Sequence, residues 1–395
     1  MANLLINENL AEYEDQEDDV RTPNYAITSY GADYPVDGLV KRIRKGDIYI
    51  PEFQRGFVWD IKTASRFIES LLIGLPVPGI FLSKDQESKL IVIDGQQRLR
   101  TIQYFYDGKI PIHNDYDLEE STIDGKVFAL KLDGNNNSSE ELENKFNNKT
   151  YNTLSDEERR RLDDAIIPAT IIKQDIPEND DSSIYQIFER LNTGGIKLTS
   201  QEIRACIYHG EFNKLLIELN RNSQWQNIFN GRTTGNFRPD LRMKDQELIL
   251  RFLALYFASI DYDGDNEKTI MYQKPMKSFL NEFMKRNRQI NNIKKEQIIN
   301  VFNHSIETIY NSIGLRAFRP KKGLNAAVLD AVLVGISRRL ERGLINQLDQ
   351  VRLQYDNLLT NQYFLSNSTE TARTTETSIV KVRLKLAIDA FKDVE

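Results

Sequence analysis

The chain has 395 residues, of which 40% are hydrophobic and 28% charged, and these proportions exclude a wholly disordered protein. Its single cysteine, Cys206, excludes an intrachain disulfide framework and a cysteine-rich zinc site. The formal net charge is −6, but residues 1–205 hold 24 basic and 37 acidic side chains (−13), and residues 206–395 hold 28 and 21 (+7). An acidic half joined to a basic half points to a polyanionic partner.

Residues 1–24 are polar and acidic, and we expect them to form a flexible tail. They lack the basic start and the apolar run of a secretory signal. No stretch of about 18 apolar residues, the usual minimum for a membrane-spanning helix, occurs in the sequence. We therefore expect a cytoplasmic protein that contacts no membrane.

From residue 25 to about 210 the pattern predicts both strands and helices. Apolar runs predict strands at 48–50, 80–82, 90–93 and 166–172, and apolar residues at helical spacing predict helices at 62–73 and 183–192. Residues 107–165 are polar and rich in asparagine, so we expect an insertion with a short charged helix at 156–164. Thr199 and Glu202 have the spacing of a capping box, which predicts the start of another helix.

From residue 211 to 395 the pattern is helical almost throughout, with a final helix expected at 379–391. The expected fold class is therefore α+β, with a mixed domain at 25–210 followed by an all-helical domain at 211–395.

The first candidate site is the segment Asp94-Gly95-Gln96-Gln97-Arg98, which follows a predicted strand and opens a helix. A glycine lets the backbone approach a ligand closely, and a helix N-terminus with a nearby guanidinium suits a phosphate. Asp94 is a candidate ligand of Mg²⁺, and the amides of Gln96 and Gln97 are suited to positioning a water or a phosphate. The alternative is an ordinary strand-to-helix turn with surface glutamines.

Two further segments are candidates. Gln54 and Arg55 lie in a loop after a predicted strand, where Arg55 offers a second phosphate clamp and the aromatic Phe57 and Trp59 offer stacking surfaces for a base. The alternative is that these two rings pack on the helix at 62–73. In the other segment, Glu189 is a candidate metal ligand, and Arg190 and Asn192 are candidates for holding an anion. The alternative is that this segment is an ordinary capped helix end.

Basic residues cluster twice in the second half of the chain. We expect DNA contacts at Lys285, Arg286, Arg288, Arg316, Arg319, Lys321 and Lys322. The alternative is that they are solvated charges on helix faces. Binding through phosphates would fall steeply with salt.

Several of these segments together carry a family resemblance. The matching stretches are Ile50 to Arg55, Leu75 to Pro78, Asp94 to Leu99, Phe188 to Gly194 and Arg242 to Asp245. The chain resembles domain-of-unknown-function family 262, the N-terminal domain of GmrSD-type modification-dependent restriction enzymes, which is similar in turn to the ParB/sulfiredoxin fold. The match of Gly95 to Arg98 to the ParB-like phosphate turn is close, whereas the helix containing Glu189 has a rearranged motif.

The resemblance implies a nucleoside triphosphatase that requires Mg²⁺ and controls DNA restriction in phage defence. Arg98, Gly95, Gln54, Arg55, Arg190 and Asn192 would hold the nucleotide, Asp94 and Glu189 the metal, and Gln96 or Gln97 the attacking water. The expected partners are DNA, including modified DNA, further copies of the chain, and a nuclease acting in trans, since we identify no HNH-type constellation here. The alternatives are a ParB-like DNA endonuclease or nickase, and a non-catalytic nucleotide-switch adaptor.

Overall fold

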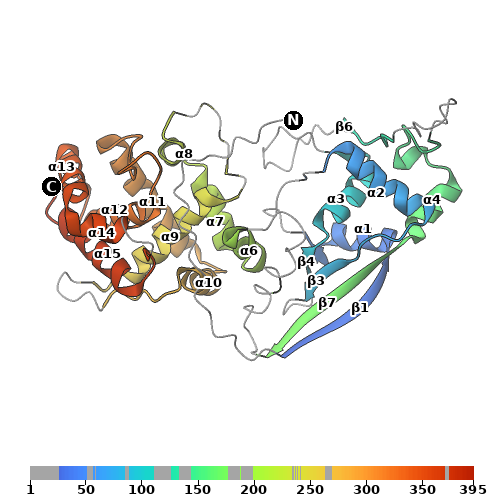
Figure 1. Ribbon diagram of the computed structural model, residues 1–395, viewed down its shortest axis with the longest axis horizontal. Helices are drawn as coiled ribbons and strands as arrows, with labels where there is room; N and C mark the ends of the chain where they lie inside the picture. Colours follow the sequence, from blue (N-terminus) through green and yellow to red (C-terminus); the bar gives the residue numbers. More distant parts are fainter. Residues whose placement is uncertain are drawn as a thin grey trace. The chain divides into compact units, whose positions relative to one another are not determined.

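The computed structural model describes residues 26–50, 57, 59–84, 89–110, 126–132, 144–176, 187, 199–233, 235, 237, 239–240, 242–262, 269–369 and 373–395. These residues form two compact units, 26–207 and 208–395. The first unit contains a mixed β-sheet with helices, and the second is built from helices (Figure 1). The predicted fold class, α+β followed by an all-helical part, is confirmed.

The first unit is organised around a five-stranded sheet with the order β1-β7-β3-β4-β2. The strands are β1 (Ala26–Pro35), β2 (Ile48–Tyr49), β3 (Ile80–Lys84), β4 (Leu90–Asp94) and β7 (Ile166–Ile176). β1 pairs antiparallel with β7 and β3 pairs antiparallel with β4, whereas β3–β7 and β2–β4 are parallel pairs. β5 (Lys109–Ile110) and β6 (Lys126–Val127) form a separate two-stranded antiparallel sheet.

Helices cover one face of this sheet and enclose the core. They are α1 (Val36–Lys45), α2 (Ile61–Ile73), α3 (Gln96–Asp107) and α4 (Asp156–Asp164), with a 3₁₀ turn η1 at Tyr151–Thr153. Alternate strand residues, among them Leu82 and Val92, join the same buried cluster as Ile68 of α2 and Ile102 of α3. The intervening residues Ile91 and Ile93 of β4 are buried as well, so this strand buries both of its faces.

The predicted insertion at 107–165 contributes to this same core. Phe128, Leu130 and Leu162 are fully buried in the cluster. Tyr106 and Tyr151 stack with ring centroids 4.2 Å apart, and both hydroxyls donate to Asp163 of α4. The described parts of this polar segment are therefore integral to the packing of the first unit.

The two longest elements of the first unit that the sequence does not predict are β1 and α1; the short elements β5, β6 and η1 are not predicted either. β1 is largely exposed, so its residues lack the apolar alternation that marks a strand. α1 follows Pro35 and ends at Gly46, which has a φ of 76° and caps the helix with its backbone N–H. The predicted strands at 48–50, 80–82, 90–93 and 166–172 and the helices at 62–73 and 156–164 are confirmed, with small differences in their ends.

The capping box at residues 199 and 202 is also confirmed. Thr199 donates its N–H to the Glu202 carboxylate at 2.5 Å, and its hydroxyl accepts the Glu202 N–H at 3.2 Å. It precedes α6 (Ser200–Ile207). The predicted helix at 183–192 lies outside the described residues, apart from residue 187.

The second unit is helical in its described part. Its helices are α7 (Glu211–Asn220), α8 (Ser223–Asn230), α9 (Lys244–Ala258), α10 (Met276–Arg286), α11 (Asn292–Ser312), α12 (Ala326–Leu340), α13 (Leu348–Thr360), α14 (Gln362–Ser368) and α15 (Thr377–Phe391). α12 is buried along almost its whole length and packs against α9, α11 and α15. The final helix, predicted at 379–391, is confirmed as α15.

Buried polar groups fix the helices of this unit to one another. Asp330 of α12 is fully buried and accepts from Arg251 of α9 at 2.7 Å and from Arg383 of α15 at 3.3 Å. Burial lowers the pKa of Arg383 to about 10, and the charge of Asp330 opposes that shift. One carboxylate thereby joins three helices, since α9 and α15 both pack against α12.

A second buried carboxylate, Asp245, lies in the segment that carries the family resemblance in the helical part. Its Oδ2 accepts from the Asn220 amide at 2.7 Å and from the Asp240 N–H at 3.0 Å, and its Oδ1 accepts from the Gln246 N–H at 2.9 Å. The side chain connects α7, α9 and the chain before α9. In the structure, Asp245 therefore holds these segments together through hydrogen bonds.

Candidate functional site

The predicted glycine turn joins β4 to α3. β4 ends at Asp94, Gly95 is the N-cap residue, and α3 begins at Gln96. Gly95 has a φ of 100°, and a Cβ at this position would lie 2.4 Å from Cγ2 of Ile80. Glycine is therefore required both for the backbone conformation and for the close approach of β3.

An irregularity in the sheet lies beside this turn. β3 pairs Phe81 with Asp94 and Leu82 with Val92, so that β4 has one extra residue, Ile93, in a β-bulge. A bulge bends its strand and changes the direction of the side chains near it, and bulges are common next to functional sites. The bulge therefore lies directly before Asp94, where it affects the direction of the end of β4.

Arg98 reaches back from α3 to Asp94. Its Nη2 donates to Oδ2 of Asp94 at 2.7 Å, and the Arg98 side chain is 15% exposed while that of Asp94 is 47% exposed. Nε of Arg98 is buried and has no hydrogen-bond partner in the part of the chain that the structure describes. A half-exposed carboxylate beside a guanidinium with an unused donor suits the joint binding of a cation and an anion.

The N-terminus of α3 adds a second anion-binding feature. Gly95 has no side chain, and within the described residues no side-chain cap is present on this helix. The first intrahelical bond runs from the N–H of Leu99 to the carbonyl of Gly95. The N–H groups of the first turn therefore have no acceptor within the helix, and they point toward the positive end of its dipole, which favours a phosphate.

Both predicted glutamines lie in the first turn of α3, where they are half-buried. Oε1 of Gln97 accepts the backbone N–H of Trp59 at 3.4 Å. This bond connects the turn to the chain that leads into α2. The role of Gln96 or Gln97 in orienting a water stays a prediction.

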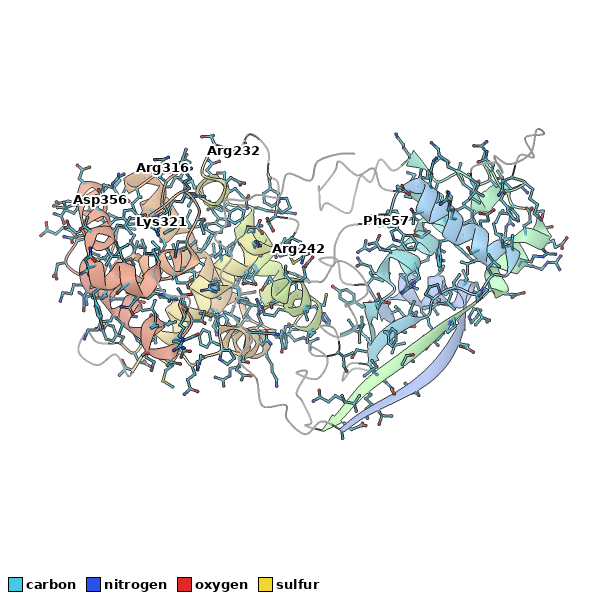
Figure 2. The ribbon with its side chains drawn as sticks, in the orientation of Figure 1. Phe57, Arg232, Arg242, Arg316, Lys321 and Asp356 are labelled. Atoms are coloured by element: carbon cyan, nitrogen blue, oxygen red, sulfur yellow. The ribbon has the colours of Figure 1, made fainter. Side chains whose placement is uncertain are left out.

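The aromatic residues near the turn pack within the first unit. Phe57 is buried and meets Tyr104 of α3 edge-to-face, with ring centroids 5.2 Å apart. Trp59 meets Phe67 of α2 in the same way, at 5.6 Å. Trp59 thus packs on the helix at 62–73, as that alternative expects, whereas Phe57 contacts α3, and Figure 2 labels Phe57 beside the helices of this unit.

Five predicted nucleotide or metal ligands lie outside the described residues: Gln54, Arg55, Glu189, Arg190 and Asn192. Among the residues that the structure does describe, no group of three or more His, Cys, Asp or Glu side chains forms a metal site. Asp94 is thus the described member of the predicted Mg²⁺ pair, and the contribution of Glu189 stays a prediction.

The first predicted DNA-contact group, at the end of α10, is engaged with neighbouring groups. Arg286 pairs with Glu282 at 2.6 Å, and Arg288 donates from Nε to the carbonyl of His209 at 2.8 Å. Nearby, Lys295 pairs with Glu218 at 2.9 Å. Lys285 lies on α10, next to Arg286. The positive charge of this group is therefore partly compensated.

The second group follows α11 and contains Arg316, Arg319, Lys321 and Lys322. Arg316 and both lysines are exposed, whereas Arg319 is half-buried. A further exposed arginine, Arg232, follows the C-cap of α8. Sequence reasoning missed it, because a single arginine after an Asn-Gly turn is no signal by itself.

The comparisons with known proteins agree with the resemblance read from the motifs. Residues 36–209 match the family model of the GmrSD restriction endonuclease N-terminal domain. An uncharacterized protein of Methanocaldococcus jannaschii is 25% identical over 288 aligned residues, covering 55% of this chain and 48% of the relative. The chain thus spans about half the length of that relative. The predicted resemblance is confirmed over 36–209, a range that includes the whole Asp94 to Arg98 turn.

No helix in the described ranges is long and apolar enough to cross a bilayer.

Proposed function

We propose that this chain is a Mg²⁺-dependent nucleoside triphosphatase that engages DNA within a restriction system and acts with a nuclease supplied in trans. The match of residues 36–209 to a restriction-endonuclease domain supports the restriction context. The observation that carries the enzymatic part is the turn itself, where a helix N-terminus with glycine as its N-cap, the Arg98 guanidinium and a half-exposed carboxylate converge.

In this proposal the triphosphate binds at the N-terminus of α3. Backbone N–H groups after Gly95 donate to phosphate oxygens, and Arg98 adds its guanidinium. Nη2 of Arg98 is shared with Asp94, and its buried Nε has no partner among the described residues. Arg55, Gln54, Arg190 and Asn192 complete the nucleotide site as predicted ligands from the segments outside the described residues.

The residues of the turn fit a magnesium ion. A carboxylate that is 47% exposed and lies directly beside the proposed phosphate site is the oxygen ligand that Mg²⁺ prefers. Asp94 would hold the ion together with Glu189 and the phosphates. When bound, Mg²⁺ supplies charge neutralisation on the phosphate oxygens.

Once the triphosphate and the ion are bound, hydrolysis needs a water molecule positioned to attack the γ-phosphorus. The water oxygen forms a bond to the γ-phosphorus, the bond to the β–γ bridging oxygen breaks, and the products are a nucleoside diphosphate and inorganic phosphate. Positioning and charge neutralisation dominate catalysis of this reaction, so amides and arginines suffice without a base that titrates near neutrality. Gln96 or Gln97 would orient the water, and Arg98 would stabilise charge on the transferred group.

The test is phosphate release by the full chain from ATP, GTP, CTP and UTP with Mg²⁺, with and without DNA. Arg98→Ala is expected to lower the rate by on the order of 10²–10³, the usual loss when a transition-state donor is removed. Arg44→Ala is the matched control, because Arg44 pairs with Asp107 at the opposite end of the same helix. It is expected to retain the wild-type rate.

Equal rates for wild type and Arg98→Ala, with both folded by circular dichroism, would overturn the assignment of the turn. Absence of turnover with every nucleotide would overturn the triphosphatase itself. Supercoiled plasmid in the same samples then separates the alternatives, since nicking by the metal-loaded chain without nucleotide would indicate a nickase, and nucleotide binding without turnover an adaptor.

A further inference from the structure

The helical unit has a basic surface formed by two chain segments, one of which contains four of the expected DNA contacts. We call it the α8–α11 patch and define it by Arg232, Arg316, Arg319, Lys321 and Lys322. Neither residues 223–233 nor residues 313–325, which provide it, contain an Asp or a Glu. Figure 2 shows Arg232, Arg316 and Lys321 on the upper side of this unit.

Arg319 holds the two segments together. Its guanidinium donates to the carbonyls of Ile228 at 2.7 Å and Phe229 at 2.6 Å in the last turn of α8, and to the carbonyl of Ala317 at 3.1 Å. A cation at a helix C-terminus is favoured by the unpaired carbonyls and by the helix dipole. Gly231 is also adjacent, since a Cβ there would lie 3.2 Å from Cζ of Arg319. Arg232 therefore leaves α8 directly beside the segment after α11.

The exposed cations of the patch have no acidic partner among the described residues. The acidic side chain labelled near them in Figure 2, Asp356, accepts from Arg352 at 2.9 Å, and Arg352 also reaches the carbonyl of Ile313. The basic group at the end of α10 differs, since Glu282 pairs with Arg286 there. In Figure 1, α10 lies at the lower edge of the unit and α8 at the upper edge.

We propose that the α8–α11 patch binds the phosphate backbone of duplex DNA, with Arg319 as the positioning residue that sets its shape. The proposal rests on the proposed function for its choice of DNA as the polyanion. Uncompensated arginines and lysines on two adjacent segments match a duplex, which carries one negative charge per ~1.7 Å of its axis. Such contacts fix the position of the protein on DNA without reading its sequence.

The four exposed cations set the expected strength of the effect. With about four phosphates neutralised, the slope of log K against log salt concentration is about −3.6, which corresponds to on the order of 100-fold weaker binding at 200 mM than at 50 mM salt. Removing two of the four cations is expected to reduce that slope by about 2 and to weaken binding by on the order of tenfold at 100 mM salt.

The experiment measures binding of the full chain to a fluorescent 20-base-pair duplex by anisotropy, at several salt concentrations and without nucleotide. Lys321→Gln/Lys322→Gln removes two charges from the patch, and Lys214→Gln/Lys295→Gln removes two cations of the same unit that are paired with Glu211 and Glu218. We expect the first variant to lose affinity and slope as stated, and the second to bind as the wild type does. Both variants are compared with wild type by circular dichroism and urea unfolding.

Equal losses in the two variants, or a larger loss in the second, would overturn the assignment to the patch. A wild-type chain that binds no duplex at 50 mM salt, or that binds single-stranded RNA more tightly, would overturn the DNA proposal. Because the assay contains no nucleotide, its result is independent of phosphate release, so failure here and failure of the triphosphatase proposal are read separately.

Discussion

Replacing Gly95 with alanine tests whether the turn between β4 and α3 depends on glycine for two separate reasons. A φ of 100° costs a residue with a Cβ about 1–3 kcal/mol. The new Cβ would also lie 2.4 Å from Cγ2 and 2.9 Å from Cβ of Ile80, a side chain that is 1% exposed, so the core must shift at a further cost of about 1–3 kcal/mol. We expect Gly95→Ala to destabilise the first unit by about 2–6 kcal/mol.

The same helix provides the control. Gly108, its C-cap, has a φ of 71°, but a Cβ there meets nothing within 4 Å. Gly108→Ala should therefore lose only the free energy of the unfavourable backbone conformation, about 1 kcal/mol, because no steric clash is added. Equilibrium urea unfolding of the full chain, followed by circular dichroism, compares the two variants, and phosphate release reports whether the turn has moved.

A double variant identifies the clashing group. Ile80→Ala removes the Cγ2 that the new methyl group meets, at a cost of about 2–5 kcal/mol by itself. In that background Gly95→Ala should cost less than in the wild type, by part of the steric cost of about 1–3 kcal/mol, because the Cβ of residue 80 stays 2.9 Å from the new methyl group. If Gly95→Ala were no more destabilising than Gly108→Ala, or if the two changes at 80 and 95 were additive, the steric reasoning would be wrong.

Three further predictions concern the helical unit, and urea unfolding tests each of them. Asp330→Ala removes the buried carboxylate that accepts from Arg251 and Arg383 and should cost about 3–5 kcal/mol, whereas Asp356→Ala breaks an exposed pair and should cost less than about 1 kcal/mol; similar losses would contradict this contrast. Asp245→Asn places an amide among donors and should cost about 1–3 kcal/mol, so an unchanged midpoint would show that the hydrogen bonds are replaceable. Arg319→Met leaves two carbonyls of α8 without their donor and should cost about 1–3 kcal/mol, and stability equal to wild type would remove its positioning role.

The elements that could be predicted from the sequence are those in which buried positions hold apolar residues at the spacing of a strand or a helix. The apolar runs at 80–82 and 90–93 predict β3 and β4 because these strands bury residues such as Leu82 and Val92. β1 gave no such signal, since Ile27 and Tyr30 are more than 40% exposed and the strand exists through its pairing with β7. A strand stabilised by a distant partner is invisible to local periodicity.

The candidate site shows the same division. The Gly95 turn could be predicted, because the apolar run before it and the helical pattern after it are its immediate neighbours in the sequence. The capping function of Arg319 could not, because its acceptors in α8 lie 90 and 91 residues away in the sequence. Charge clustering alone therefore grouped Arg319 with its exposed neighbours, and only the fold distinguishes an arginine that supports the surface from those that form it.

The strand order of the sheet has a consequence for synthesis of the chain. β7 lies between β1 and β3, so β1 has no place in the sheet until residues 166–176 have been translated. At ~5–20 residues per second, β1 leaves the ribosome on the order of ten seconds before its partner. During that interval the edge of β3 that β7 will occupy is an open template for strand pairing. A nascent chain arrested before β7 should therefore be recognised by chaperones or aggregate, whereas one arrested shortly after it can close the sheet.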